Sequence, residues 1–196
     1  LRASIEGPIR ILIPMVTNIS EMKKIKSVLN IAHRKLQKSG LKIPDELPPL
    51  GVMIEVPGAA LAADSFAQVC DFFAIGSNDL TMYTLAADRA DKNVSHLFDP
   101  LHPGVLKLIQ LTVNAALRAR IPVSICGEIA GQPRYTALLL GLGLRELSMS
   151  PNAIPQVKQC IHRIDAAAAA TRTNLILEQV DSGRILTLLD DFNSFN

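Results

Sequence analysis

Short apolar runs alternate with longer amphipathic segments along this chain. The runs that resemble buried strands span residues 10–14, 51–56, 72–76, 122–126 and 146–149. Between them apolar residues recur at helical spacing, which predicts helices over 20–39, 59–69, 103–120, 133–140 and 155–163. Nearly continuous apolar strands are typical of buried parallel sheets, and connections long enough for a helix favour parallel pairing. The pattern therefore predicts an α/β fold built on a parallel sheet.

Capping residues suggest the limits of two helices. Ser20 is the expected N-cap of the first helix, and Gly40 lies where its C-terminal turn favours a left-handed residue. Asp165 is the expected N-cap of a polyalanine helix that begins at Ala166. We therefore expect two parts: a strand–helix domain over residues 1–165, and a helical tail over 166–196 that packs on this domain or extends it.

Three successive strands end on side chains that can carry chemistry. Glu55 lies at the end of the second strand, Asn78 and Asp79 follow the third, and Cys126 ends the fourth. In a (β/α)8 barrel of the TIM type, the carboxyl ends of the parallel strands form the rim that holds the active site. Such a barrel needs eight strand–helix units, and five are visible here. The chain therefore resembles five-eighths of a barrel, with a candidate active site on its rim.

Composition and charge exclude several classes of function. The chain has 196 residues, is 48% hydrophobic and 19% charged, and can bury a core. Its net charge is only +2 with scattered Lys and Arg, so we expect no nucleic-acid partner. No apolar run approaches the roughly 20 residues of a membrane helix, and no secretory signal pattern is found. Three widely spaced cysteines favour a reducing, cytoplasmic setting over disulfides or a zinc site.

The two strand-end carboxylates, Glu55 and Asp79, are candidate metal ligands. Carboxylates at the ends of adjacent parallel strands can supply two oxygen ligands to Mg²⁺, which fills its remaining positions with water and substrate oxygens. The alternative is that each is an exposed loop acid, or that Asp79 caps a short helix over 80–85. Their matched positions on two strands favour the metal site.

Asn78 and Arg89 are candidate phosphate-binding residues. An amide donates hydrogen bonds without adding charge, and a guanidinium matches the oxygens of a phosphate with two parallel bonds. Each has a simpler alternative, because Asn78 suits a turn and Arg89 could pair on the surface with Asp88 or Asp91.

Cys126 is the candidate acid–base residue. A free cysteine is most often a small buried hydrophobe, yet this one lies at a strand end, where a thiol could give a proton to a carbanion or enolate. Cys70 and Cys160 lie on helical segments among apolar neighbours, so we assign them no function.

Several segments, taken together, resemble the phosphoenolpyruvate-utilising enzymes. They are 51–57 (GVMIEVP), 71–81 (DFFAIGSNDLT), 85–89 (LAADR), 126–131 (CGEIAG) and 142–150 (LGLRELSMS). The similarity runs from about Arg2 to Ile164 and is greatest to the enzyme I group of phosphoenolpyruvate–protein phosphotransferases, which serve the bacterial sugar phosphotransferase system. Two positions differ from that group: Met82 stands where Gln is usual, and Gln132 where Asp is usual.

The resemblance implies a fold, a reaction and residue roles. It implies a (β/α)8 barrel of which this chain holds the last five units, and which dimerises. It implies that Glu55 and Asp79 bind Mg²⁺, that Asn78 and Arg89 hold the phosphate of phosphoenolpyruvate, and that Cys126 protonates the enolate to give pyruvate. The phosphoryl group would pass to a histidine on an N-terminal domain and then to a small phosphocarrier protein.

Two other interpretations stay open from the sequence. The chain could come from the barrel domain of pyruvate phosphate dikinase or phosphoenolpyruvate synthase, which share this fold. It could also be a non-catalytic dimerisation or regulatory module, because an open sheet edge invites association. None of the four histidines matches the phosphorylated motif, so we expect that this chain does not complete the phosphotransfer cycle alone.

Overall fold

A parallel five-stranded sheet forms the centre of the molecule. The computed structural model describes residues 1–194, and its strands pair in chain order, β1-β2-β3-β4-β5. They are β1 (Ile11–Ile13), β2 (Leu50–Ile54), β3 (Phe72–Gly76), β4 (Val123–Cys126) and β5 (Glu146–Leu147). Every neighbouring pair is parallel. The predicted α/β fold with a parallel sheet is therefore confirmed.

Helices connect the strands and extend beyond the last one. The α-helices are α1 (Ile19–Lys38), α2 (Pro57–Leu61), α3 (Ala63–Phe66), α4 (Ser77–Leu85), α5 (Pro103–Ala119), α6 (Pro133–Gly141), α7 (Ile154–Ile161), α8 (Ala166–Leu177) and α9 (Ser182–Ser194). Short 3-10 turns are η1 (Arg2–Ile5), η2 (Ser95–Leu97), η3 (Glu128–Gly131) and η4 (Pro151–Ala153). Among the described residues, no helix is long and apolar enough to cross a membrane.

The two faces of the sheet differ in their side chains. One face lies in the hydrophobic core with α5, which packs over β3 and β4 beside α2 and α3. The residues of β2, β3 and β4 on this face are at most 8% exposed: Val52, Ile54, Phe73, Ile75, Val123 and Ile125. The other face carries these residues in matching register, most of them small: Gly51, Met53, Phe72, Ala74, Gly76, Ser124 and Cys126. The candidate chemistry lies on this second face.

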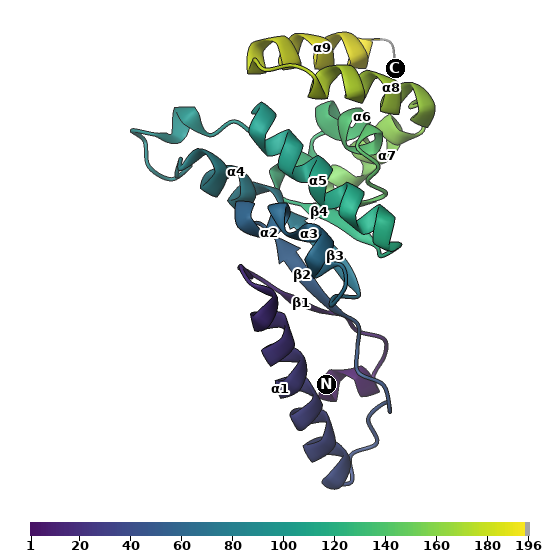
Figure 1. Cartoon of the computed structure of the whole chain (residues 1–196). Coiled ribbons are helices and arrows are strands. Elements are labelled where there is room, and N and C mark those ends of the chain that lie inside the picture. Colours follow the sequence, from purple (N-terminus) through teal and green to yellow (C-terminus); the bar gives the residue numbers. More distant parts are fainter. Residues whose placement is uncertain (195–196) are drawn as a thin grey trace.

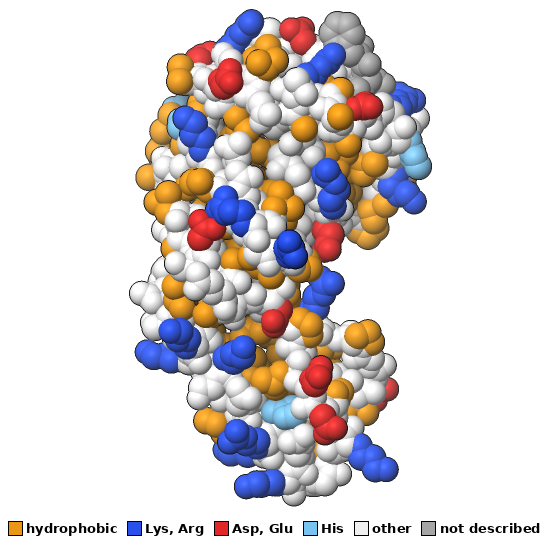
Figure 2. All heavy atoms as spheres, turned by 45° about the vertical axis from the view of Figure 1, so that its right-hand side comes forward, with side chains coloured by type: hydrophobic (Ala, Val, Ile, Leu, Met, Phe, Trp, Pro, Cys, Tyr) orange, Lys and Arg blue, Asp and Glu red, His pale blue; other side chains and the backbone are white. Residues whose placement is uncertain are grey.

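The molecule is elongated, with α1 at one end and α8 and α9 at the other (Figure 1). Met22 of α1 is 1% exposed, but Val28 and Ile31 on the same helix are 63% and 52% exposed. Figure 2 shows a hollow between the two ends, with apolar side chains gathered around it. The sheet, with β1 and β5 as its edges, links the two ends.

The C-terminal helices pack on the last strand–helix unit. Helix α8 lies against α6, and α9 contacts both of them. Gly141, at the end of α6, allows the close approach, since a Cβ there would lie 2.5 Å from the carbonyl oxygen of Ala169. Asp165 caps α8 as expected, accepting a 2.7 Å hydrogen bond from the Ala168 N–H. The boundary at residue 165 between two parts stays a prediction.

Two local expectations were wrong in detail, and a third was confirmed. Asn18, not Ser20, caps α1, because its side chain and that of Glu21 form a reciprocal capping box. The single helix expected over 59–69 is two short helices, α2 and α3, which meet at Ala62 with φ −96° and ψ 13°. Gly40, by contrast, has the expected positive φ of +80°.

Candidate active site

The candidate residues meet at the carboxyl ends of three adjacent strands. Gly76 pairs with Cys126 in the register of β3 and β4, and Glu55 directly follows the last paired residue of β2. A Cβ on Gly76 would lie 2.5 Å from Glu55 Oε2 and 2.9 Å from Glu55 Cβ. Glu55 and Cys126 therefore flank Gly76 in one row, and the absence of a side chain at Gly76 leaves room for the carboxylate.

Glu55 is a buried carboxylate with an anchored orientation. It is 3% exposed, and its Oε1 accepts a 2.7 Å hydrogen bond from the N–H of Met15 in the loop after β1. Burial raises the pKa of Glu55, and the nearby Asp79 carboxylate raises this pKa further. The hydrogen bond from the Met15 N–H lowers it, but the net shift is upward. Two carboxylates that disfavour each other's charge form a place where a cation is stabilised.

Asn78 and Asp79 lie in the first turn of α4. This helix begins at Ser77, so Asp79 is inside the helix and is not its cap. Asn78 Oδ1 accepts a 3.2 Å hydrogen bond from the N–H of Glu128. Because the amide oxygen has this donor, the Nδ2 group of Asn78 is the part left to donate to a ligand.

Ser77 and Gly127 join the ends of β3 and β4. The Ser77 hydroxyl donates a 2.7 Å hydrogen bond to the carbonyl oxygen of Cys126. Gly127 has φ +99°, and a Cβ there would collide with Ser77 Oγ and lie 3.0 Å from Asn78 Oδ1. Glycine is required here both by its backbone conformation and by the close approach. These contacts fix Cys126 and Asn78 relative to each other.

Cys126 carries a protonated thiol. Its Sγ lies 3.4 Å from the carbonyl oxygen of Ile75 and donates to it. Burial raises the pKa of the Cys126 thiol, and the carboxylates of Glu55 and Asp79 add to the rise. The group therefore holds its proton near neutral pH, as a proton donor must.

Arg89 reaches the same rim from the loop after α4. Its Nη1 lies 2.7 Å from Glu128 Oε1, in an exposed ion pair. The sequence left open a surface ion pair of Arg89 with Asp88 or Asp91. In the structure Arg89 pairs instead with Glu128, which lies 39 residues further along the chain. Glu128 thus holds Arg89 with its side chain and Asn78 with its N–H.

A cavity opens beside this row. Its volume is about 520 Å³, and Asn78, Cys126 and Glu128 contribute to its wall. The segment after β5 also lines it, through Ser148, Met149 and Ser150. A volume of this order suits a small organic ligand.

The rim carries carboxylate oxygens, the donor type that Mg²⁺ prefers. This ion prefers oxygen ligands and commonly binds one or two protein carboxylates, with water and substrate in its other positions. Within residues 1–194, no three His, Cys, Asp or Glu side chains gather in a way that could hold a metal. The rim therefore offers an ion two neighbouring carboxylates, those of Glu55 and Asp79.

The structure adds residues that the sequence argument did not select. Glu128, Ser77 and the backbone of Met15 each position a candidate residue through a hydrogen bond. Glu128 lies in the 126–131 segment that resembles the family, but its role as a positioning residue becomes clear only from its contacts with Arg89 and Asn78. The contact between the Met15 N–H and Glu55 joins residues 40 positions apart and could not be predicted from their spacing in the sequence.

Several known proteins are similar to this chain in sequence. A family model described as "PEP-utilising enzyme, PEP-binding domain" matches residues 1–166. A phosphoenolpyruvate-protein phosphotransferase of Cupriavidus necator is 50% identical over 81% of this chain and 27% of its own length. One of Haemophilus influenzae is 38% identical over the whole chain and 34% of its own length. The chain thus spans about a third of the length of the curated relatives it matches.

The fold has a relative among solved structures. A citrate lyase of Burkholderia xenovorans superposes with a TM-score of 0.62, over 98% of this chain and 66% of that one. Sequence identity is only 16%, so the likeness concerns the fold alone. The match over residues 1–166 and the identities to full-length relatives establish the family. The chain belongs to the phosphoenolpyruvate-utilising enzymes, and its residues 1–166 match the model of their phosphoenolpyruvate-binding domain.

Proposed function

We propose that this chain is the phosphoenolpyruvate- and Mg²⁺-binding part of a phosphoenolpyruvate–protein phosphotransferase. Such an enzyme moves the phosphoryl group of phosphoenolpyruvate to a histidine on another domain and releases pyruvate. The observation that carries the proposal is the meeting of Glu55, Cys126 and the Asn78–Asp79 pair at one rim, beside a cavity. The names of the similar proteins favour this reaction over the dikinase and synthase alternatives.

Glu55 and Asp79 would hold the metal. The raised pKa of Glu55 reflects burial and repulsion by Asp79, and a divalent cation between the two carboxylates would reverse that repulsion. When bound, Mg²⁺ would neutralise charge on the phosphoryl group, which is the main requirement of phosphoryl transfer.

Asn78 and Arg89 would hold the phosphate. The Nδ2 group of Asn78 is available to donate because Glu128 occupies its amide oxygen. Arg89 is paired with Glu128 at a surface where ion pairs contribute little. A phosphate dianion can therefore compete for this guanidinium, which would exchange one oxygen partner for two.

Cys126 would supply the proton that completes the reaction. Loss of the phosphoryl group from the phosphoenolpyruvate oxygen leaves an enolate. The proton on Sγ then goes to the terminal carbon of the enolate, giving the methyl group of pyruvate, and the thiolate regains a proton from water. The raised pKa of Cys126 keeps the thiol protonated until the enolate forms.

The wider setting follows from the same proposal. The five parallel strands would be the last five units of a (β/α)8 barrel, in agreement with their sequential order. The partners would be an N-terminal phosphohistidine domain, a small phosphocarrier protein and a second copy of the barrel, in the cytoplasm. The helical tail expected over residues 166–196 would pack on that barrel through α8 and α9; residues 195–196 lie outside the described part of the chain.

Calorimetric titration of the chain with phosphoenolpyruvate, with Mg²⁺ and with EDTA, tests the proposal. We expect saturable binding only with Mg²⁺, and loss of that binding in Asp79→Asn. Asp64→Asn is the matched control. The substitution removes the same charge, but Asp64 pairs with Arg118 on the surface and is not one of the candidate site residues. Binding that persists in Asp79→Asn, or no binding to a chain shown to be folded by circular dichroism, would contradict the assignment.

A further inference from the structure

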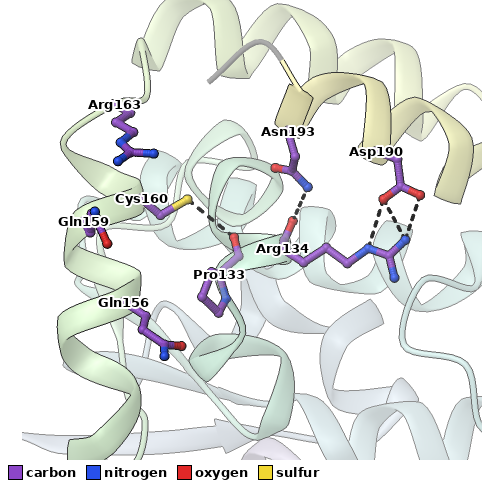
Figure 3. Close-up of a pocket in the computed structure, with 8 residues that line it drawn as sticks. All are labelled: Pro133, Arg134, Gln156, Gln159, Cys160, Arg163, Asp190 and Asn193. Carbon is purple, nitrogen blue, oxygen red and sulfur yellow. Dashed lines mark hydrogen bonds and ion pairs between the residues drawn. The ribbon is translucent and has the colours of Figure 1, made fainter.

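A second cavity lies among the C-terminal helices. Its volume is about 490 Å³, within the range of small-molecule sites. The lining residues are Pro133, Arg134, Gln156, Gln159, Cys160, Arg163, Asp190 and Asn193. Figure 3 shows that they come from three elements: the start of α6, the α7 segment and the end of α9. None of them lines the cavity at the rim.

One face of α7 forms a polar wall of this pocket. Gln156, Gln159 and Cys160 are spaced i, i+3 and i+4, so they lie on the same side of the helix. Arg163 follows one turn later, where its N–H bonds to the carbonyl oxygen of Cys160. Two amides and a guanidinium, all on exposed residues, therefore border the cavity along α7 and the turn that follows it.

The opposite wall is held together by its own hydrogen bonds. Arg134 Nη2 lies 2.6 Å from Asp190 Oδ1 and 2.9 Å from Asp190 Oδ2. Asn193 Nδ2 donates a 2.9 Å bond to the carbonyl oxygen of Arg134, and Cys160 Sγ lies 3.5 Å from that of Pro133. These contacts link α6 with α9 and α7 (Figure 3), so the pocket has a defined shape before any ligand arrives.

The charge of the pocket is not balanced. Asp190 neutralises Arg134, but within residues 1–194 no carboxylate makes an ion pair with Arg163. Its guanidinium stands beside the cavity in Figure 3. One positive charge therefore remains among neutral hydrogen-bonding groups, which is the arrangement that binds a small anion.

We propose that this pocket is a second ligand site, which takes a small molecule bearing a phosphate or carboxylate group. Arg163 binds the anionic group through its guanidinium, and the amides of Gln156 and Gln159 donate further hydrogen bonds. The site is separate from the rim and needs neither Glu55 nor Asp79. It therefore stands whether or not the rim binds phosphoenolpyruvate.

The test is an NMR titration of the ¹⁵N-labelled chain at constant ionic strength. Inorganic phosphate and succinate are added in separate series, and the side-chain amide signals of Gln156 and Gln159 are followed. We expect a saturable shift of these signals with at least one anion, and the series that saturates identifies the preferred group. In Arg163→Gln the affinity should fall at least about tenfold, as expected for loss of a charged hydrogen bond.

Lys158→Gln is the matched control for this titration. Lys158 lies on the same helix and loses the same charge, but it does not line the pocket. Its affinity should equal that of the unmodified chain. The proposal is overturned if neither anion gives a saturable shift, or if Lys158→Gln weakens binding as much as Arg163→Gln does.

Discussion

Gly76→Ala should destabilise the fold through a steric conflict at the candidate site. The backbone of Gly76 has φ −84°, which alanine adopts without strain. The conflict arises because the new Cβ would lie 2.5 Å from Glu55 Oε2 and 2.9 Å from Glu55 Cβ. The carboxyl oxygen can rotate away, but the Glu55 Cβ is fixed by the backbone at the end of β2.

The magnitude follows from two contributions. Overpacking of a buried position costs about 1–3 kcal/mol. If the Glu55 carboxylate moves, it also loses its 2.7 Å bond from the Met15 N–H, and a hydrogen bond to a charged group contributes about 1.5–3 kcal/mol. We expect a loss of about 3 kcal/mol in the free energy of unfolding, which shifts the urea midpoint by about 1.5 M at a typical slope of about 2 kcal/mol per M.

Equilibrium urea unfolding, followed by circular dichroism, measures the effect. Gly58→Ala is the control, because a Cβ at Gly58 has nothing within 4 Å and the residue lies in α2. That substitution should raise stability by about 0.4–1 kcal/mol, since alanine restricts the unfolded chain. A Gly76→Ala midpoint equal to that of Gly58→Ala would refute the argument that Glu55 fills the space above Gly76.

Three further predictions concern other residues. Thr173→Val should stabilise the fold by about 1 kcal/mol, because the buried Thr173 hydroxyl has no hydrogen-bond partner within residues 1–194. The control Thr112→Val should not stabilise the fold, because it loses a 2.9 Å hydrogen bond to the carbonyl oxygen of Leu108. Asp165→Ala should cost about 1 kcal/mol by loss of the α8 cap. Both are measured by urea unfolding. Alkylation of Cys126 by iodoacetamide, followed by peptide mass spectrometry across pH, should report a pKa above that of an ordinary thiol. Asp79→Asn should lower this pKa by removing a repelling carboxylate.

Each of these predictions has an outcome that would contradict it. A destabilised Thr173→Val chain would mean that its hydroxyl does bond, and an unchanged Asp165→Ala chain would mean that the cap contributes nothing. An alkylation pKa for Cys126 that is the same in Asp79→Asn would place the two residues too far apart to interact.

The arrangement of the strands could be predicted because burial leaves a direct mark on sequence. Segments such as 72–76 are apolar throughout, and the structure buries all five residues of β3. Exact helix limits were harder to predict. Both Asn18 and Ser20 are good N-caps, and Glu21, three residues after Asn18, decides between them through the capping box. The break between α2 and α3 falls at Ala62, where no proline or glycine predicts the end of a helix.

The positions of site residues could be predicted, but their partners could not. The ends of parallel strands meet at one edge, so the approach of Glu55 and Cys126 follows from the fold. The pairing of Arg89 with Glu128 joins two loops 39 residues apart and depends on how both loops fold. The second pocket depends on the packing of α9 and α7 around the start of α6, which local sequence does not determine.

The central claim is that the ends of β2, β3 and β4 form a Mg²⁺–phosphoenolpyruvate site. A crystal structure of the chain with phosphoenolpyruvate and Mn²⁺, which stands in for Mg²⁺ and is located by anomalous scattering, tests it most directly. The claim predicts the ion in contact with the carboxylates of Glu55 and Asp79, and the phosphoryl oxygens within hydrogen-bond distance of Asn78 Nδ2. An ion and ligand bound elsewhere, with this rim unchanged, would contradict it.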